Sequence, residues 1–429
     1  MNTTESSGST AASDFALDTQ KQDLGSFVRN YAARLKGGEL GLLPAMISIF
    51  VLGSLFTYAT QSRSGKFFSL FNGANLVQQA AAVIMISVGV TFVLLLGEID
   101  LAAGWTAGVT AGVLVTALRD GRPLIVAALM SFGAAMLLGL FTGYMVAKIG
   151  IPSFVVTLAN FLIFQGILLL ITGEGGTVQL SDKTVRAIMN KNMGVLGSWI
   201  LAVLVIGTFV WSEFRKAQRD PAGYPLPVAV SKIIAVAIPV LGLTLIFSRN
   251  RAFSNSTVKL VGYPIVVPVV LAIVSVLTLL LTRTAYGRHL YATGGNTEAA
   301  RRAGINVEMI RLSAFVMCAL VAGFGGWLLA SRSGSVDPQM GGNDTLLRAV
   351  GAAVIGGTSL FGGKGRLPNA LLGGLALAMI ENGLPLVGKA VPFGIFHVDF
   401  NKSGVKYMAS GLILFLAASL DALSRKRKG

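Results

Sequence analysis

Apolar stretches long enough to cross a bilayer recur along most of this chain, and short polar segments separate them. A helix needs about 20 mostly apolar residues to cross the hydrocarbon core. The sequence predicts twelve such spans, at 41–60, 75–97, 99–118, 123–147, 153–172, 194–212, 228–247, 263–282, 311–330, 346–362, 367–387 and 405–421. We therefore predict an all-α, polytopic transmembrane helical bundle of about 12 spans, with its membrane domain at 41–421.

The two ends of the chain differ from this pattern. Residues 1 to about 23 are rich in polar residues and lack the cationic start and apolar core of a secretory signal. Residues 24–36 place apolar side chains at helical spacing, which predicts an interfacial amphipathic helix within a cytoplasmic tail at 1–40. An even number of spans puts both termini on one side, and the basic tail at 422–429 marks that side as cytoplasmic.

Composition agrees with a membrane protein. The chain is 53% hydrophobic and 13% charged, whereas soluble domains have about 25% charged residues. The net charge of +16 is compatible with nucleic-acid binding or with a role in membrane topology. The basic residues are scattered over short loops, which favours the topology role. We therefore predict lipid, and not nucleic acid, as the partner of these charges. The single cysteine, Cys318, lies in an apolar run, and His289 and His397 are far apart, so no disulfide framework or metal site is predicted.

Two acids, Glu98 and Asp100, stand between two apolar runs with almost no loop, and Gly97 and Gly104 flank them. A very tight hairpin would satisfy the polar groups of this segment, and so would a broken helix in the protein interior. Both alternatives stay open at the level of the sequence.

Polar residues at membrane depth are candidates for a translocation path. A charge there costs roughly 2.5–3.5 kcal/mol on insertion scales, so it usually faces a cavity or a partner. The candidates are Glu98, Asp100, Asn160, Gln165, Glu381 and Asn382. Structural roles are the alternative: Glu98 and Asp100 could cap a helix, and Glu381 could lie near the outer interface. The proton-relay acids that many secondary transporters carry are absent from the sequence.

Glycines recur along residues 350–380. Small residues let helices approach backbone to backbone, where lipid provides no hydrophobic drive. The candidates for such packing are Gly356, Gly357, Gly362, Gly363, Gly373 and Gly374, and the packing could be static or allow sliding. The stretch GGTSLFGGKG is not a phosphate-binding loop, because Thr358 stands where the first glycine is required and Gly365 follows Lys364. If ATP drives this protein, another chain must therefore hydrolyse it.

The stretch YATGGNTEAARRAGIN lies between two strongly apolar regions. Its cap residues, Asn296 and Thr297, and its terminal Gly304 predict a two-turn helix, EAARRA. The residues in question are Thr297, Glu298, Ala299, Ala300, Arg301, Arg302, Ala303 and Gly304. Such a slim helix could fit a groove in a partner protein, with its arginines pairing to acids there. An ordinary solvated loop helix is the alternative.

Four ordered motifs resemble the permeases of ABC importers for monosaccharides, the ribose and xylose type. They are GEIDLAAG, IPSFVVTLANFLIFQG, AAVIGGTSLFGGKG and GRHLYATGGNTEAARRAGIN, and the resemblance covers most of the chain. The long 173–282 region, with its extra pair of spans, is most similar to the xylose branch. The chain departs from the pattern at Ala102, where serine is usual, and at Glu381, where asparagine is expected.

This resemblance implies a mechanism and a set of partners. Two permease subunits pair, a cytoplasmic ATPase with ATP and Mg²⁺ binds below, and an extracytoplasmic sugar-binding protein docks outside. Residues 298–304 would form the coupling helix, and the permease would have no catalytic activity or cofactor of its own. It would reside in the bacterial inner membrane. A permease for another small solute, such as a branched-chain amino acid or a signalling sugar, is one alternative. A stand-alone secondary transporter or channel is another.

Overall fold

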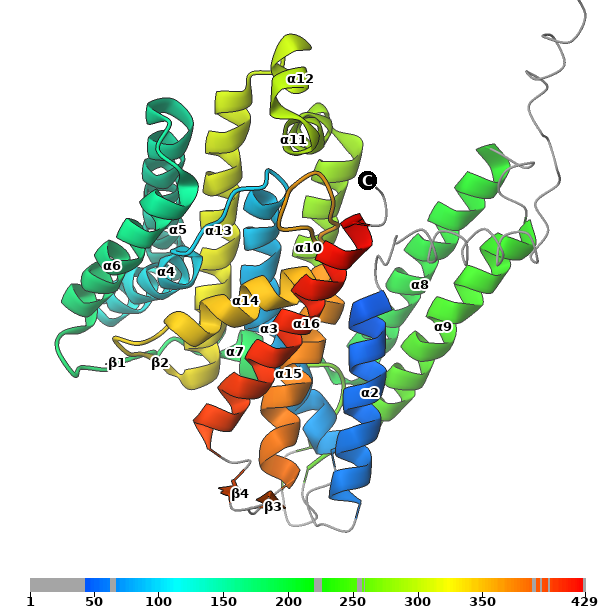
Figure 1. Ribbon diagram of the computed structural model, residues 1–429. Coiled ribbons are helices and arrows are strands. Elements are labelled where there is room, and N and C mark those ends of the chain that lie inside the picture. The colour runs from blue at the N-terminus through cyan, green and yellow to red at the C-terminus, as the bar shows by residue number, and fades with distance from the viewer. Residues whose placement is uncertain are drawn as a thin grey trace, which may run out of the picture.

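A computed structural model describes residues 43–61, 67–219, 226–252, 257, 259–387, 391–393, 396–399 and 402–426. The predicted tail at 1–40, with its amphipathic helix, and the last three residues of the basic tail lie outside this range. The described chain is almost entirely helical, and four strands of two or three residues add to it. Figure 1 shows a bundle of long helices, crossed at one end by two short ones.

The helices that correspond to predicted spans are α2 (Leu43–Thr60), α3 (Leu70–Leu94), α4 (Ala103–Arg119), α5 (Leu124–Tyr144), α6 (Ser153–Thr172), α8 (Gly194–Arg219), α9 (Leu226–Ser248), α10 (Val266–Arg283), α13 (Val307–Ser333), α14 (Asn343–Ile355), α15 (Asn369–Val387) and α16 (Ser403–Lys426). The remaining elements are η1 (Met145–Ile149), α7 (Lys183–Asn190), α11 (Ala285–Gly295), α12 (Thr297–Arg302), β1 (Val178–Gln179), β2 (Ser335–Val336), β3 (Val391–Phe393) and β4 (Phe396–Val398). Strands β1 and β2 pair antiparallel, as do β3 and β4.

Eight helices of the described chain are long and apolar enough to cross a membrane: α3, α5 with η1, α6, α8, α9, α10, α13 and α15. Helix α2 adds a shorter apolar stretch. The predicted span 346–362 needs correction, because α14 has 13 residues and is therefore about 20 Å long. It ends at Ile355, where the glycine-rich segment begins, and cannot cross a core of about 30 Å alone.

Helices α3 and α13 form the centre of the bundle. In their most apolar 18-residue stretches, 78% of α3 and 61% of α13 is buried, against 11% of α8 and of α9. Glycines let these central helices approach closely: a Cβ at Gly326 of α13 would collide with the backbone carbonyl of Ala107 in α4. Helix α13 also packs against α3 and α5.

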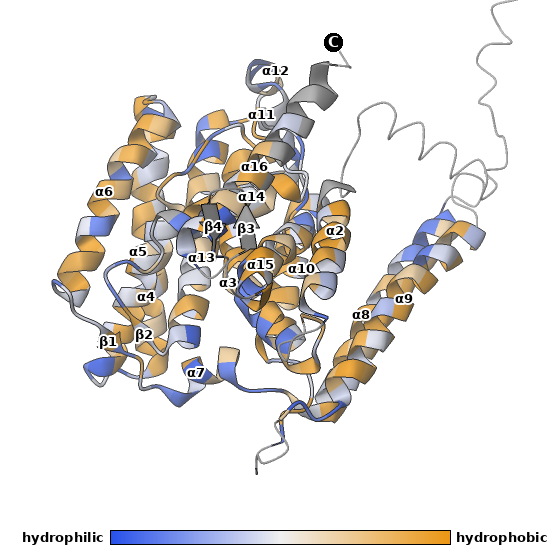
Figure 2. Ribbon diagram, turned by 60° about the horizontal axis from the view of Figure 1, so that its bottom comes forward, coloured by the Kyte–Doolittle hydropathy of each residue, from blue (hydrophilic) through white to orange (hydrophobic). Residues whose placement is uncertain are grey.

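The outer helices present apolar surface. Phe154, Leu158 and Leu162 of α6 and Leu204 of α8 are all exposed. Figure 2 shows this apolar colour over α6 and over the α8–α9 hairpin, which stands beside the main bundle. Such a surface suits lipid and would be unfavourable in water, so the chain is a multi-pass membrane protein.

The segment between α3 and α4 is not a very tight hairpin, because eight residues without helix, 95–102, separate the two helices. Helix α3 ends in a Schellman motif: Glu98 N donates to Val93 O over 3.2 Å and Gly97 N to Leu94 O over 2.9 Å. Gly97 has the positive φ of 75° that this end requires. Residues 95–102, which we call the connector, then run without helix to Ala103, where α4 begins.

Candidate functional site

Helices α11 and α12 lie across one end of the bundle, and α12 forms its extreme tip (Figure 1). The sequence predicted α12 and its cap: the Asn296 side chain accepts from Ala299 N over 2.9 Å. Gly304, at φ 79°, ends the turn as predicted. Helix α11 was not predicted, because Thr293, Gly294 and Gly295 have low helix propensity. Packing holds it instead, since Leu290 is fully buried.

The side chains of α12 divide into an exposed charged face and a buried contact. Glu298 forms ion pairs with Arg301 over 3.3 Å and with Arg302 over 3.4 Å, and all three side chains are more than half exposed. Ala300 is buried, and the Thr297 hydroxyl donates to Thr293 O over 3.0 Å. Ala299 and Ala303 are exposed. The helix thus offers a slim, charged, solvent-facing surface.

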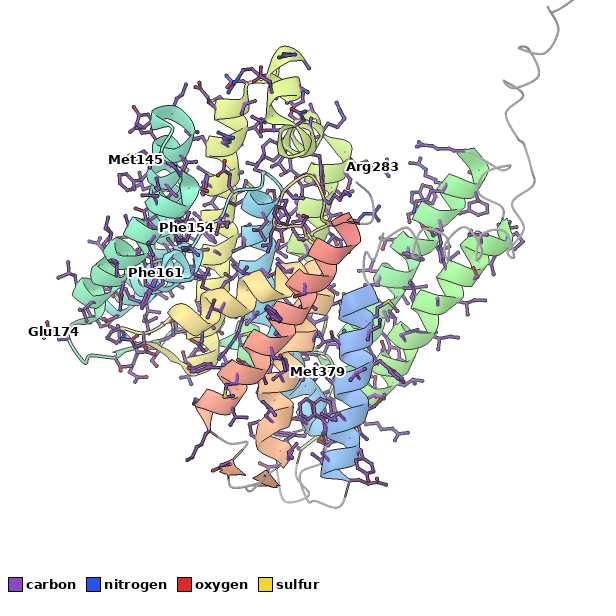
Figure 3. All side chains as sticks on the ribbon, viewed as in Figure 1. Met145, Phe154, Phe161, Glu174, Arg283 and Met379 are labelled. Carbon is purple, nitrogen blue, oxygen red and sulfur yellow. The ribbon has the colours of Figure 1, made fainter. Side chains whose placement is uncertain are left out.

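Further cations surround α12 on this end of the molecule. Arg283 closes α10, and Arg288 lies on α11; both are exposed, as are Lys364 and Arg366 from the loop between α14 and α15. Figure 3 shows Arg283 on the side that carries α11. Helix α16 also ends on this side (Figure 1).

Behind α11, three backbone segments meet at glycines. We call residues 356–368, between α14 and α15, the glycine loop. Gly363 N of this loop donates to Leu95 O of the connector over 2.8 Å. A Cβ at Gly294 of α11 would collide with the same Leu95 oxygen and lie 3.0 Å from Gly363 N. A Cβ at Gly362 would lie 2.7 Å from Gly294 O and 2.8 Å from Gly97 N. We call this three-way contact the junction.

Side chains reinforce the junction. The Tyr291 hydroxyl of α11 donates to Gly365 O over 2.9 Å. Burial raises the pKa of Tyr291, so its hydroxyl stays protonated and able to donate. Glu98 of the connector pairs with Arg311 of α13 over 3.3 Å. The α11–α12 end is therefore joined to the connector, to the glycine loop and, through the connector, to α13.

The six predicted path residues have different surroundings. Glu98 is the connector residue paired with Arg311. Asp100 is buried, accepts from Ala102 N over 2.9 Å and accepts from the Cys318 thiol over 3.5 Å. It thereby holds the turn that leads into α4.

Asn160 is buried in α6, and its amide donates to the Thr142 hydroxyl of α5 over 2.9 Å. Asn382 of α15 is buried and accepts from the Asn72 amide of α3 over 2.6 Å. Gln165 is half-buried on α6. The observed bonds of Asn160 and Asn382 join helices to one another, and the roles of these residues in a path stay predictions.

Three of the six glycines named as packing positions lie at helix ends and crossings. A Cβ at Gly356 would lie 2.6 Å from Asn369 O, one at Gly373 would collide with Ala352 O, and one at Gly374 would collide with the Ile84 side chain. The other three, Gly357, Gly362 and Gly363, lie further along the glycine loop and have φ of 84°, 83° and 71°. Only glycine adopts this left-handed backbone at no steric cost.

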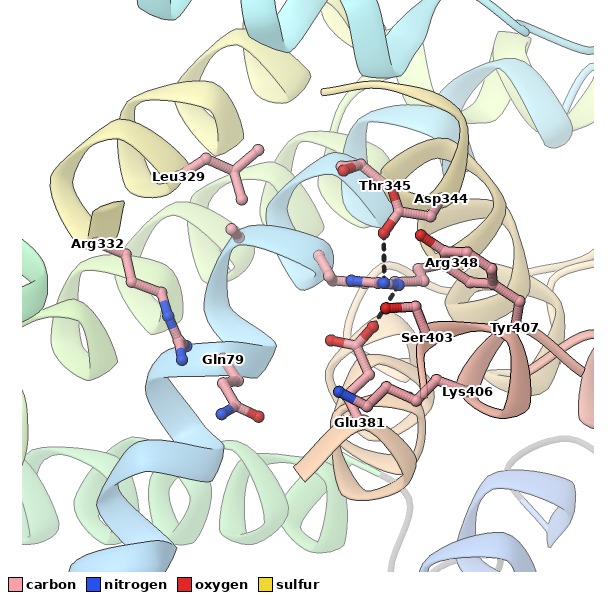
Figure 4. A pocket seen from close by; sticks show the side chains of 12 residues that line it. Gln79, Leu329, Arg332, Asp344, Thr345, Arg348, Glu381, Ser403, Lys406 and Tyr407 are labelled. Carbon is pink, nitrogen blue, oxygen red and sulfur yellow. Dashed lines mark hydrogen bonds and ion pairs between the residues drawn. The ribbon is translucent and has the colours of Figure 1, made fainter. Parts of the chain in front are cut away.

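Glu381 belongs to a second feature, a polar cavity of about 430 Å³ between α3 and α13–α16. Its lining residues are Gln79, Ala82, Val83, Leu329, Arg332, Asp344, Thr345, Arg348, Glu381, Ser403, Lys406 and Tyr407. Arg348 forms ion pairs with both Asp344 and Glu381 (Figure 4). Arg332 is near the end of α13 remote from α12, about 38 Å from Val307 at a rise of 1.5 Å per residue.

Neither the cavity nor the junction follows from the sequence pattern. Arg332 and Arg348 each lie near one end of a predicted span, 311–330 and 346–362, where a cation usually indicates membrane topology. Gly294 and Gly295 directly precede the helix cap Asn296, and two adjacent glycines at that place are the signal in the sequence for a close backbone contact. Within the described residues, no three His, Cys, Asp or Glu side chains gather as a metal site requires.

Comparison with known proteins identifies the family of this chain. Residues 72–418 match the model of the family described as "Branched-chain amino acid transport system / permease component". The chain belongs to this permease family. The matched residues include the connector, α11, the glycine loop and the lining of the cavity. The junction and the cavity are therefore parts of a permease.

Similar proteins are named as permeases for sugars. This permease is 34% identical to the xylose transport system permease protein XylH of Escherichia coli (strain K12), over 92% of this chain and 97% of the relative. It is 28% identical to the fructose import permease protein FrcC of Rhizobium meliloti, over 89% and 86% of the two chains. The ribose import permease protein RbsC of Escherichia coli (strain K12) is 28% identical, over 80% and 86%. No solved structure matches this permease.

Proposed function

We propose that this chain is the membrane subunit of an ATP-driven ABC importer for a monosaccharide, xylose or a related sugar, in the bacterial inner membrane. The relative with 34% identity is a xylose transport permease, and the fructose and ribose permeases are more distant. The family description names branched-chain amino acids, so a permease for such an amino acid is the second candidate.

The observation that supports coupling best is the junction. Gly294 of α11 contacts the connector and the glycine loop backbone to backbone, with no flexible side chain between them. Packed backbones transmit a displacement instead of absorbing it. A push on α11–α12 from outside the membrane therefore reaches the start of α4 and the loop between α14 and α15.

The partners follow from this proposal. A separate cytoplasmic ATPase binds ATP and Mg²⁺ and engages α12, a sugar-binding protein docks at the other end, and a second copy of this chain completes the permease. The exposed arginines on and beside α12 agree with a cytoplasmic location for this end, since cytoplasmic segments are rich in Lys and Arg. Helix α16 ends on this side at Lys426 (Figure 1), and we propose that both termini are cytoplasmic.

Charge reversal on α12 tests the coupling. We expect Arg301→Glu with Arg302→Glu to leave the permease in the membrane and to weaken ATPase binding at least about tenfold, because two interfacial like-charge contacts cost several kcal/mol. Pull-down of the ATPase with the detergent-solubilised permease measures this. The control is Arg119→Glu with Arg122→Glu, an equal charge change on the α4–α5 turn. Undiminished binding together with normal uptake would refute the role of α12.

A further inference from the structure

The polar cavity contains three buried atoms without a hydrogen-bond partner, and one of them, Glu381 Oε1, is in an ion pair with Arg348. Gln79 Oε1, an acceptor, and Arg332 Nη1, a donor, are both buried and unpartnered. Figure 4 shows Gln79 on α3 and Arg332 on α13, with Glu381 and Lys406 to their right, and all four residues line the cavity. A buried polar group without a partner costs about 1–3 kcal/mol, so a ligand that satisfies both atoms would be favoured.

The acids of the cavity are already engaged. Asp344 and Glu381 both pair with Arg348. Arg332 donates through Nη2 to Asn75 Oδ1 over 3.3 Å, while its Nη1 has no partner, and Lys406 is the third cation of the lining. The groups available to a ligand are therefore one amide acceptor, two cationic donors and the hydroxyls of Thr345, Ser403 and Tyr407.

These groups suit a neutral compound rich in hydroxyls. Each hydroxyl both donates and accepts, so neighbouring hydroxyls can satisfy Gln79 Oε1 and Arg332 Nη1 together. An ionised phosphate offers acceptors and leaves Gln79 Oε1 without a donor. A branched-chain amino acid needs an apolar pocket for its side chain, whereas Ala82, Val83 and Leu329 are the apolar members of the lining.

The position and size of the cavity also fit a solute. Its volume of about 430 Å³ lies within the range of about 300–1,000 Å³ found for small-molecule sites. It lies toward the end of α13 remote from α12, which under the proposed function is the side where the sugar arrives. It is also built from five helices, and α14 and α15 are the pair that the glycine loop joins.

We propose that this cavity is a sugar-binding site of the permease itself, in which Gln79 and Arg332 bind neighbouring hydroxyls of a neutral monosaccharide and Lys406 contributes a further donor. This assignment rests on the proposed function for the identity of the solute. A displacement of the glycine loop would shift α14 against α15 and so change the wall formed by Arg348 and Glu381. The site would then bind the sugar in one state and release it in the other.

The test is binding of D-xylose to the purified full-length permease in nanodiscs, without ATPase or binding protein, by saturation-transfer NMR over the millimolar range. We expect wild type to bind D-xylose in preference to L-leucine and to inorganic phosphate. Gln79→Leu removes the acceptor at nearly constant volume and should weaken binding at least about tenfold, the equivalent of one satisfied hydrogen bond. Arg332→Lys, which keeps the charge, should weaken it less.

The matched control is Gln78→Leu. Gln78 precedes Gln79 on α3, but its amide donates to Met189 O over 2.5 Å, outside the cavity lining. We expect Gln78→Leu to bind D-xylose as wild type does. Wild type that does not bind D-xylose, equal binding by Gln79→Leu and wild type, or a preference for L-leucine or phosphate would each overturn the assignment.

Uptake measurements separate this assignment from the proposed function. Sugar binding that depends on Gln79, in a permease whose complex shows no ATP-driven uptake, would contradict the function and leave the site standing. ATP-driven xylose uptake by Gln79→Leu at an unchanged KM would support the proposed function and contradict the assignment of the site.

Discussion

Replacing Gly294 by alanine tests whether the junction transmits motion. Alanine fits the backbone of α11, where Gly294 has no positive φ, but its Cβ would collide with Leu95 O. The hydrogen bond from Gly363 N to Leu95 O, 2.8 Å long, must then lengthen or break.

The expected cost follows from these contacts. Overpacking costs about 1–3 kcal/mol, and the weakened backbone bond about 0.5–1.5 kcal/mol. Alanine recovers up to about 1 kcal/mol of helix propensity. We therefore expect Gly294→Ala to destabilise the permease by about 1–4 kcal/mol, which lowers its melting temperature in detergent without preventing folding.

Function should suffer more than stability, because the three segments can no longer keep their contact. We expect sugar uptake by proteoliposomes with ATPase and binding protein to fall at least about tenfold, as a shift of roughly 1.4 kcal/mol in a coupling equilibrium would produce. ATPase binding should persist, since α12 is unchanged.

The neighbouring glycine provides the control. A Cβ at Gly295 would meet nothing within 4 Å, so Gly295→Ala makes the same chemical change in the same helix without a collision. We expect wild-type uptake and an equal or higher melting temperature. Equal behaviour of the two variants would refute the reasoning.

Three further substitutions test other contacts. Glu98→Ala should lower uptake and leave ATPase binding intact, and a double-mutant cycle with Arg311→Ala should show a coupling of about 0.5–3 kcal/mol in thermal stability; additive effects would argue against the ion pair. Gly373→Val should place a side chain against the α14 backbone and reduce the yield of folded permease, measured by size-exclusion chromatography; a wild-type profile would contradict this contact. Asn382→Leu should leave the buried Asn72 amide without this partner and lower stability by about 1–3 kcal/mol, measured by thermal unfolding; an unchanged midpoint would show that the bond contributes nothing.

The sequence pattern predicted most long helices, because a lipid-facing helix must be apolar over its full length whatever it packs against. Helix boundaries depended on local chemistry that this pattern does not include. Helix α13 begins at Val307, four residues before the predicted span, because the Asn306 side chain accepts from Met309 N over 3.1 Å. Helix α8 continues to Arg219, past the predicted end of its span at 212, as about two mostly polar turns outside the apolar run.

The candidate sites were only partly predictable. The caps and charges of α12 are local, so its shape could be predicted, whereas α11 forms through tertiary contacts. The junction joins Gly294 to Leu95 and Gly363, and the cavity brings Arg332 and Arg348 together. Neither set of positions shares a local pattern, because both meetings depend on how distant helices pack.

The most direct test of the account is ATP-driven uptake of D-xylose by proteoliposomes that contain this permease, its ATPase and its sugar-binding protein, with ATP hydrolysis measured in the same vesicles. We predict that wild type shows uptake that requires ATP and that Arg301→Glu with Arg302→Glu abolishes uptake. The same variant should lose the stimulation of hydrolysis by the binding protein. Uptake without ATP, or uptake and hydrolysis unchanged by the two substitutions, would contradict the account.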